Sequence, residues 1–291
     1  MTHERENIIE IKNLTKSYGK KRGVKAISLS VRQGDIFGFL GQNGAGKSTT
    51  IRSMLGLLHY QEGEIRILQM DAVKNQNEIL RQVGYMPSEA MFYPSMKVKE
   101  VISFAARARK TDCSKEAARL CEVLKVDEEK KIEELSLGNR KKVSIVCAMQ
   151  HRPRLLILDE PTSGLDPLMQ EAFFELLLEY NRQGTTCFLS SHVLSEVKNY
   201  CRHAAIIKEG AIIRTDTVEN LSKSDARYVK LTRGGQKREF VYTGKINALL
   251  HELANMQVED VLIEEPSLDE IFRHYYEDKE SGADMQKEGQ I

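Results

Sequence analysis

Glycine, lysine and hydroxyl side chains occur at a fixed spacing near the start of the chain. Residues 41–49 fit the pattern G-x-x-x-x-G-K-[ST], which describes a phosphate-binding loop. Glycines let the backbone approach an anion closely, and backbone amides at a helix amino terminus then donate hydrogen bonds to it. Lys47 would reach the β- and γ-phosphates, and the Ser48 hydroxyl would ligate Mg²⁺. The expected phosphate contacts are Gly41, Asn43, Gly44, Ala45, Gly46, Lys47, Ser48 and Thr49.

Two carboxylates and a histidine follow other apolar runs. Residues 155–158 are four consecutive apolar residues, which predict a strand buried on both faces, and Asp159 and Glu160 come directly after them. His192 follows a predicted strand at residues 185–189 in the same way. Ligands of open α/β sheets bind at the carboxyl ends of the strands, so these side chains are candidates for chemistry.

The elements that must position these residues alternate between strands and helices. The apolar run 36–40 predicts the strand before the loop, and residues 49–58 predict the helix after it. Asp166 and Pro167 predict a helix start with an amphipathic face that continues to Tyr180. Further strands are expected at residues 8–18, 24–31, 63–68, 83–87, 204–207, 211–214, 228–232, 238–242 and 258–264. Further helices are expected from residue 98, from a Ser114 cap, at about residues 139–150, from residue 246 and from a capping box at Ser267 and Glu270.

Composition limits the classes of protein that this chain can represent. Its 291 residues suit one large domain or two smaller ones, and 43 basic against 42 acidic residues give no indication of nucleic acid or an anionic membrane as partner. The five cysteines lack metal-ligand spacing, which favours reduced thiols in a cytoplasm. No apolar run approaches the roughly 18–20 residues that cross a bilayer, so a partner would have to supply any membrane spans.

Two features remain open to more than one interpretation. Tyr18 lies upstream of the phosphate loop and would either stack on an adenine ring or simply pack at the rim of the site. Residues 88–94 form an apolar loop around Met91, Phe92 and Tyr93, which is either a docking surface or a segment tucked into the core.

Five motifs occur in one order: the phosphate loop, Leu-Ser-Leu-Gly-Asn at 135–139, the strand ending in Asp159 and Glu160, Ser-Gly-Leu-Asp at 163–166, and His192. In these motifs the chain resembles the ATP-binding subunits of ABC transporters, over about residues 8–214. The rest resembles the extension of bacterial export-type ABC ATPases, including those of drug and peptide-antibiotic exporters. The resemblance implies an α/β P-loop NTPase core at residues 1–215, with a helical subdomain at about 91–150. A C-terminal α+β subdomain at 216–276 and a polar, disordered tail at 277–291 would follow.

The resemblance also implies roles for individual residues. Asp159 would hold Mg²⁺, Glu160 would orient and polarise the attacking water, and His192 would contact the γ-phosphate. Ser136 and Gly138 would belong to the signature motif, which closes on ATP held by a second cassette, and Asp166 would join the dimer interface. The implied partners are a separately encoded permease and a second cassette, either identical or a paralogue. The implied location is cytoplasmic, on the inner face of the cell membrane through the permease.

The sequence departs from the family pattern at two places. Leu137 and Asn139 stand where the signature usually has glycine and glutamine, although Ser136 is retained. Ser88 stands where the family usually has a glutamine that senses Mg²⁺. Either Ser88 or its neighbour Glu89 could take over that contact, and the sequence does not choose between them.

Three functions remain in competition. The first is the ATPase of a membrane exporter, and the second is a soluble ABC ATPase of DNA repair or translation, whose relatives tend to carry insertions or a second cassette that this chain lacks. The third is a regulatory module that binds ATP without useful turnover. The sequence does not identify the transported substrate, and export is inferred only from the C-terminal extension.

Overall fold

The computed structural model describes residues 6–19, 23–222, 226–256 and 258–264. Within it the chain divides into two compact units, Met1–Thr215 and Asp216–Ile291. The helix predicted from the capping box at Ser267 and the polar tail predicted at 277–291 lie outside the described residues.

A six-stranded sheet forms the centre of the first unit. Its strand order is β10-β9-β3-β8-β7-β6, and β9, β3, β8, β7 and β6 run parallel to one another. Every residue of β3, β7 and β8 is buried, which explains why β3 and most of β7 are continuous apolar runs in the sequence. The bounds are β3 Ile36–Leu40, β6 Val83–Met86, β7 Leu155–Asp159, β8 Thr186–Ser191, β9 His203–Lys208 and β10 Ala211–Thr217.

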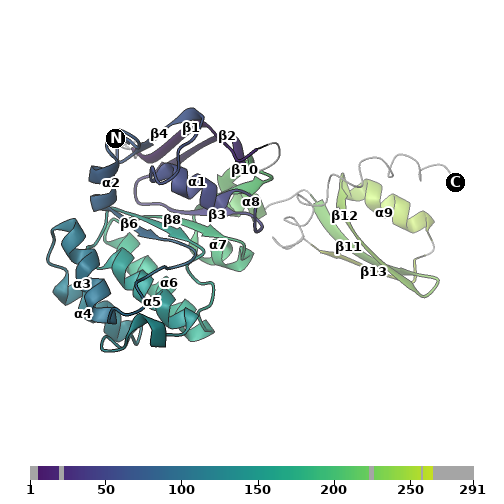
Figure 1. Ribbon diagram of the computed structural model, residues 1–291. Coiled ribbons are helices and arrows are strands. Elements are labelled where there is room, and N and C mark those ends of the chain that lie inside the picture. The colour runs from purple at the N-terminus through teal and green to yellow at the C-terminus, as the bar shows by residue number, and fades with distance from the viewer. Residues whose placement is uncertain (1–5, 20–22, 223–225, 257, 265–291) are drawn as a thin grey trace. The chain divides into compact units, whose positions relative to one another are not determined.

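A second, antiparallel sheet has the order β2-β1-β4-β5. In β2 the apolar side chains alternate with exposed ones, so that Ile27, Leu29 and Val31 are buried on one face as predicted. Helix α1, Lys47–Met54, lies between the two sheets and contacts β1, β2 and β4 on one side and β7 on the other (Figure 1). The bounds are β1 Asn7–Ser17, β2 Gly23–Arg32, β4 Glu62–Ile67 and β5 Met70–Asp71.

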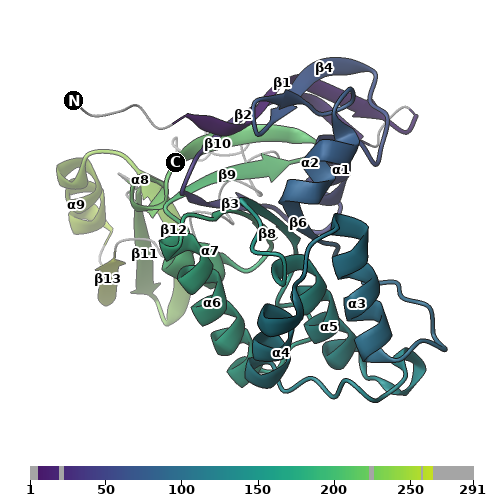
Figure 2. The ribbon, with the colours of Figure 1, turned by 90° about the vertical axis from the view of Figure 1, so that its left-hand side faces the viewer.

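The remaining helices of this unit surround the central sheet. Helices α3 and α4 pack on α5, and α5 packs on β6, so the three form one group beside the edge of the sheet (Figure 2). Helices α6 and α7 pack on β8 and β3, on the face away from α1. The bounds are α2 Gln76–Gln82, α3 Val98–Arg109, α4 Ser114–Val123, a 3₁₀ turn Ile132–Glu134, α5 Leu137–Met149, α6 Pro167–Arg182 and α7 Leu194–Tyr200.

Three predicted helices had wrong ends. The helix after the phosphate loop begins at Lys47 rather than residue 49, and it stops at Met54 rather than residue 58, because Gly56 adopts a φ of 65° that ends it. Helix α5 starts at Leu137, two residues earlier than expected, because Ser136 is its N-cap and accepts a hydrogen bond from the Asn139 amide at 3.3 Å.

The third error concerns the helix predicted to be capped by Ser114. That residue is the first of α4, and Cys113 holds the cap position without a side-chain hydrogen bond. Asp112 instead accepts a hydrogen bond from the Ser114 amide at 3.0 Å. The predicted cap at Asp166 is confirmed, since its carboxylate accepts from the Met169 amide at 3.1 Å.

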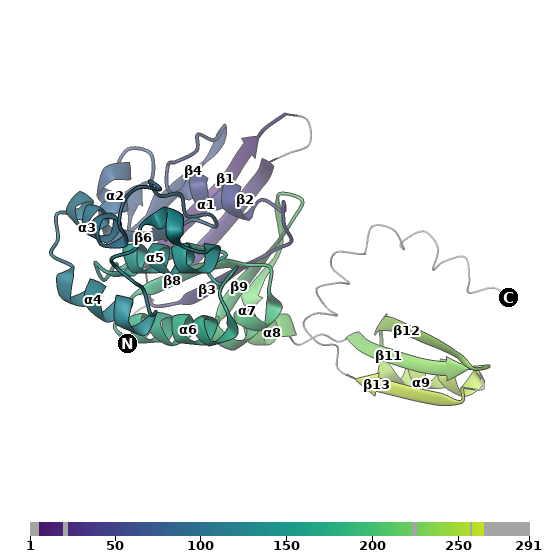
Figure 3. The same cartoon turned by 60° about the horizontal axis from the view of Figure 1, so that its bottom comes forward.

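The second unit contains a three-stranded antiparallel sheet of order β12-β11-β13 with α9 packed on one face (Figure 3). Val229 and Leu231 of β11 form a small core with Leu249 and Leu253 of α9. The bounds are α8 Val218–Ser222, β11 Ala226–Arg233, β12 Gln236–Thr243, α9 Ile246–Asn255 and β13 Asp260–Glu264. Among the residues that the structure describes, no helix combines the length and the apolar character needed to cross a membrane.

Candidate nucleotide-binding site

Three adjacent parallel strands end at the same edge of the central sheet, each followed by a segment with candidate chemistry. The phosphate loop follows β3, Glu160 follows β7, and His192 follows β8. The register sets Leu40 beside Ser191 and Ser190 beside Asp159, so the three strands end level with one another. Parallel pairing therefore brings together residues that lie more than a hundred positions apart in the chain.

The phosphate loop turns directly into helix α1. Gly46 precedes the helix with a φ of 111°, a left-handed conformation that a side chain would strain. The Lys47 ammonium reaches back over the loop and donates to the carbonyls of Gly41 at 2.6 Å and Gln42 at 3.1 Å. The first amides of a helix have no acceptor within the helix, so they are available to an anion at this end of α1.

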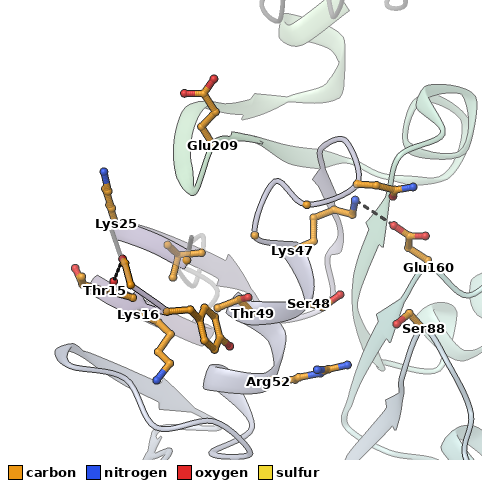
Figure 4. A pocket seen from close by; sticks show the side chains of 18 of the residues that line it. Thr15, Lys16, Lys25, Lys47, Ser48, Thr49, Arg52, Ser88, Glu160 and Glu209 are labelled. Atoms are coloured by element: carbon orange, nitrogen blue, oxygen red, sulfur yellow. Dashed lines mark hydrogen bonds and ion pairs between the residues drawn. The ribbon is translucent and has the colours of Figure 1, made fainter. Parts of the chain in front are cut away.

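A chain of polar contacts crosses the site from the phosphate loop to the residue after β8. The Lys47 Nζ lies 3.1 Å from Oε1 of Glu160, and Oε2 of Glu160 lies 3.4 Å from Nδ1 of His192. Figure 4 shows the Lys47 and Glu160 side chains pointing toward one another. Burial on its own would raise the pKa of the Glu160 carboxyl, but the Lys47 ammonium and the His192 ring lower that pKa below its usual value. Glu160 is therefore ionised at neutral pH.

The backbone at Glu160 is held in a left-handed conformation, with a φ of 49°. Such a conformation is strained for a residue with a side chain, and it persists where neighbouring groups impose it. Here the Glu160 amide donates to the carbonyl and the hydroxyl of Ser190, each at 3.2 Å. In this conformation the carboxylate contacts both Lys47 and His192.

Asp159 has one satisfied and one unsatisfied carboxylate oxygen. The residue is fully buried, and its Oδ1 accepts a hydrogen bond from the Ser190 hydroxyl at 2.6 Å. Its Oδ2 has no hydrogen-bond partner among the described residues. A buried oxygen of this kind normally has a partner, and a carboxylate and a hydroxyl such as that of Ser48 are hard oxygen donors that suit a small divalent cation or its bound water. The residues present therefore fit Mg²⁺.

Lys47, Ser48 and Glu160 border a cavity of about 1210 Å³, whereas Asp159 and His192 are not among the residues that line it. Tyr18 stands on its wall with 52% of its surface exposed, and the Lys16 ammonium lies 5.1 Å from the centre of its ring. Both Ser88 and Glu89 also border the cavity. The sequence-predicted residues that line it are Tyr18, Asn43, Gly44, Gly46, Lys47, Ser48, Thr49, Ser88, Glu89 and Glu160.

Other predicted site residues lie beside this cavity or away from it. Gly41 and Ala45 belong to the phosphate loop but contribute backbone contacts within it. Ser136 and Gly138, at the start of α5, do not line the cavity. A Cβ on Gly138 would lie 2.7 Å from the carbonyl oxygen of Gly164, so this position requires glycine for a close backbone approach.

Several residues that support the site were not found by sequence reasoning. Glu196 of α7 accepts hydrogen bonds from the hydroxyls of Thr162 at 2.5 Å and Ser191 at 2.6 Å, and so links the segment after β7 to the end of β8. Its position four residues after His192 was the available signal in the sequence. Lys141 of α5 donates to the Ser88 carbonyl at 2.6 Å, a contact that no spacing rule indicates.

The site can be compared with those of known proteins. The sequence pattern of the ABC transporter family matches residues 24–163. The chain is 36% identical over 240 residues to the bacitracin transport ATP-binding protein BcrA of Bacillus licheniformis, an alignment that covers 80% of this chain and 78% of that protein. It is 33% identical over 268 residues to the linearmycin resistance ATP-binding protein LnrL of Bacillus subtilis (strain 168), covering 90% and 84%.

A comparison with solved structures gives the same family. One described as the ATP-binding subunit of an ABC transporter has a TM-score of 0.71 at 25% identity, and the match covers 92% of this chain and 99% of the other. The predicted family, the predicted P-loop fold and the predicted ATPase activity are thus confirmed. The chain belongs to the ABC transporter family, as an ATP-binding and ATP-hydrolysing subunit that resembles those of export-type transporters.

Proposed function

We propose that this chain powers a membrane exporter, through ATP-driven pairing of two cassettes on a separately encoded permease. The observation that carries the proposal is the convergence of Lys47, Glu160 and His192 at the ends of three adjacent strands. This arrangement places a phosphate-binding cation, an ionised carboxylate and an imidazole around one point, where the terminal phosphate and its attacking water would meet.

The Lys47 contacts suggest how binding and hydrolysis are connected. Phosphate oxygens and the Glu160 carboxylate compete for the same ammonium, which lies 3.1 Å from Oε1 of Glu160. A phosphate that takes this ammonium would free the carboxylate to orient a water molecule and to accept its proton. Loss of the nearby cation would also raise the pKa of Glu160, which makes it a better base.

Two further groups of residues have roles in this proposal. Ser48 and Asp159 would hold Mg²⁺, the latter directly or through water, with Ser88 or Glu89 as an additional contact. Mg²⁺ would supply charge neutralisation at the phosphates. Tyr18 would stack on the adenine ring at the outer wall of the cavity, as its exposed ring allows.

The signature residues support a paired arrangement. Ser136 is exposed and stands at the amino end of the 13-residue helix α5, and it does not line the cavity bordered by Lys47, Ser48 and Glu160. A hydroxyl and helix amides at such an end suit a γ-phosphate. In the proposed dimer they would close on ATP held by a second cassette, with Asp166 at the interface.

The loop after β6 is a candidate contact with the permease. Met91 is 91% exposed and Tyr93 is 73% exposed, so this apolar loop is not tucked into the core. Exposed apolar side chains of this size suit a protein interface. Relatives named for bacitracin transport and linearmycin resistance favour export of a drug or peptide antibiotic. We place the subunit on the cytoplasmic face of the cell membrane, held there by the permease.

Replacing the Glu160 carboxylate tests the catalytic part of the proposal. Glu160→Gln should lower the rate of phosphate release from MgATP by about 100-fold or more, because it removes the group that accepts the water proton. Glu171→Gln is the matched control, since it makes the same change at an exposed position of α6. Hydrolysis by the unmodified protein that is no faster than by Glu160→Gln would contradict the catalytic assignment and favour a binding module.

A second measurement tests the assembly. The Glu160→Gln protein should form a dimer with MgATP and remain monomeric with MgADP, as seen by light scattering during gel filtration. The tagged chain, isolated gently from membranes of its native cell, should carry a polytopic membrane protein in stoichiometric amount. Recovery with ribosomes or repair factors in the soluble fraction would refute the transport role.

A further inference from the structure

A lysine is buried in the helix that begins at the signature motif. Lys141 of α5 is 2% exposed, and lysine is seldom buried to this extent unless its ammonium has a partner. The partner is the backbone carbonyl of Ser88, to which Nζ donates a hydrogen bond at 2.6 Å. Hydrogen bonds from an ionised donor are among the stronger ones in proteins. This one joins two segments that are 53 residues apart.

The two segments that this hydrogen bond joins would serve different nucleotide sites in the proposed dimer. Ser88 and Glu89 border the nucleotide cavity, directly after β6. Helix α5 carries Ser136 at its amino end, outside that cavity. The bond therefore links the wall of one nucleotide site to the helix that, in the proposed dimer, would serve the ATP of the other cassette.

The pKa of Lys141 lies below its usual value. Burial lowers the pKa of Lys141, while the carboxylates of Asp159, Glu160 and Glu89 act in the opposite direction. An apolar side chain of the same length would fill the space without the cost of desolvating a charge. Packing alone therefore gives no reason for a lysine here, whereas a fixed link to the Ser88 carbonyl does.

We propose that Lys141 is a positioning residue, which fastens the Ser88–Glu89 segment to α5 so that nucleotide contacts in one site and the signature of the same chain move together. The inference rests on the proposed function, because it requires two cassettes that share their signatures. It assigns Lys141 no contact with nucleotide. Its removal should change turnover and cooperativity between the sites, and leave the affinity for nucleotide at the phosphate loop intact.

The test compares variants of the full-length chain in steady-state hydrolysis. Lys141→Met keeps the side-chain length and removes the donor, Lys141→Gln keeps a neutral donor, and Lys142→Met makes the same change one residue along, at a half-buried position. We expect Lys141→Met to lower kcat about 10-fold, as the loss of one charge-assisted hydrogen bond implies, and to bring the Hill coefficient for ATP to about one. MgADP affinity should stay within about twofold of the unmodified value, and Lys141→Gln should recover part of both kcat and the Hill coefficient.

The outcomes separate this inference from the function on which it rests. A failure of the unmodified protein to exceed the hydrolysis rate of Glu160→Gln refutes the proposed function. If the unmodified protein hydrolyses ATP, two results overturn the Lys141 inference. One is a Hill coefficient of one for the unmodified protein, and the other is a Lys141→Met variant with normal kcat and cooperativity. A joint fall of melting temperature and MgADP affinity in Lys141→Met and Lys141→Gln would show a packing role only, and also overturns it. If Lys141→Met does not fold, Lys141→Gln decides: normal melting with kcat and Hill coefficient equal to those of the unmodified protein overturns the inference.

Discussion

A buried carboxylate on α4 joins that helix to α6 and to the segment after α5. Glu116 of α4 is 8% exposed and accepts hydrogen bonds from Arg119 at 2.6 Å, from Arg152 at 2.6 Å and from the Tyr180 hydroxyl at 2.7 Å. These donors come from α4, from the segment just after α5 and from α6. Glu116→Gln would keep the shape of the side chain and remove the charge that holds the three donors together.

The size of the effect follows from the pKa of the carboxyl. Burial on its own would raise this pKa, but the hydrogen bonds from Arg119, Tyr180 and Arg152 lower it from 4.5 to about 2. That difference corresponds to about 3 kcal/mol of stability. Because the pKa of the folded protein lies below that of the unfolded chain, this stability is fully present above about pH 4.5 and is lost as the pH falls toward 2.

The assay is thermal unfolding followed by far-ultraviolet circular dichroism between pH 7 and pH 3. At pH 7 Glu116→Gln should melt about 6 °C or more below the unmodified protein, and the gap should narrow below about pH 4.5. Glu122→Gln on the exposed side of α4 is the matched control and should shift the midpoint by about 1 °C or less. A gap below 2 °C at pH 7, or one that stays constant down to pH 3, would refute the reasoning.

Two further predictions concern the nucleotide site. Tyr18→Ala should weaken ATP binding about 5- to 150-fold by titration calorimetry, while Tyr18→Phe keeps the ring and should bind normally; equal affinity of all three proteins would leave Tyr18 as a rim residue. Glu196→Gln should lower kcat about 10-fold with little change in ATP affinity, because the carboxylate accepts from both Thr162 and Ser191 and so holds the segments that carry Glu160 and His192. A normal kcat for Glu196→Gln would show that those segments hold their positions without it.

The sequence alone determined the parts of this protein in which chemistry and local structure coincide. The phosphate loop needs its glycines and lysine in one continuous stretch, so residues 41–49 could be found by pattern, and the buried strands before Lys47 and Asp159 are continuous apolar runs. The order of the five motifs then predicted the family, the fold and the ATPase activity, all of which are confirmed. Helix ends were less predictable, because Gly56 and Ser136 act through local geometry.

Only the tertiary structure decided which of the dispersed residues meet. The pairing of Lys47 with Glu160, and of Glu160 with His192, depends on the order and register of β3, β8 and β7, which no local pattern encodes. The helix α7 was not predicted, so the link from Glu196 to the two strand ends was not predicted either. Lys141 and Ser88 meet through a backbone carbonyl, a partner that every residue offers and that the residue type therefore cannot signal.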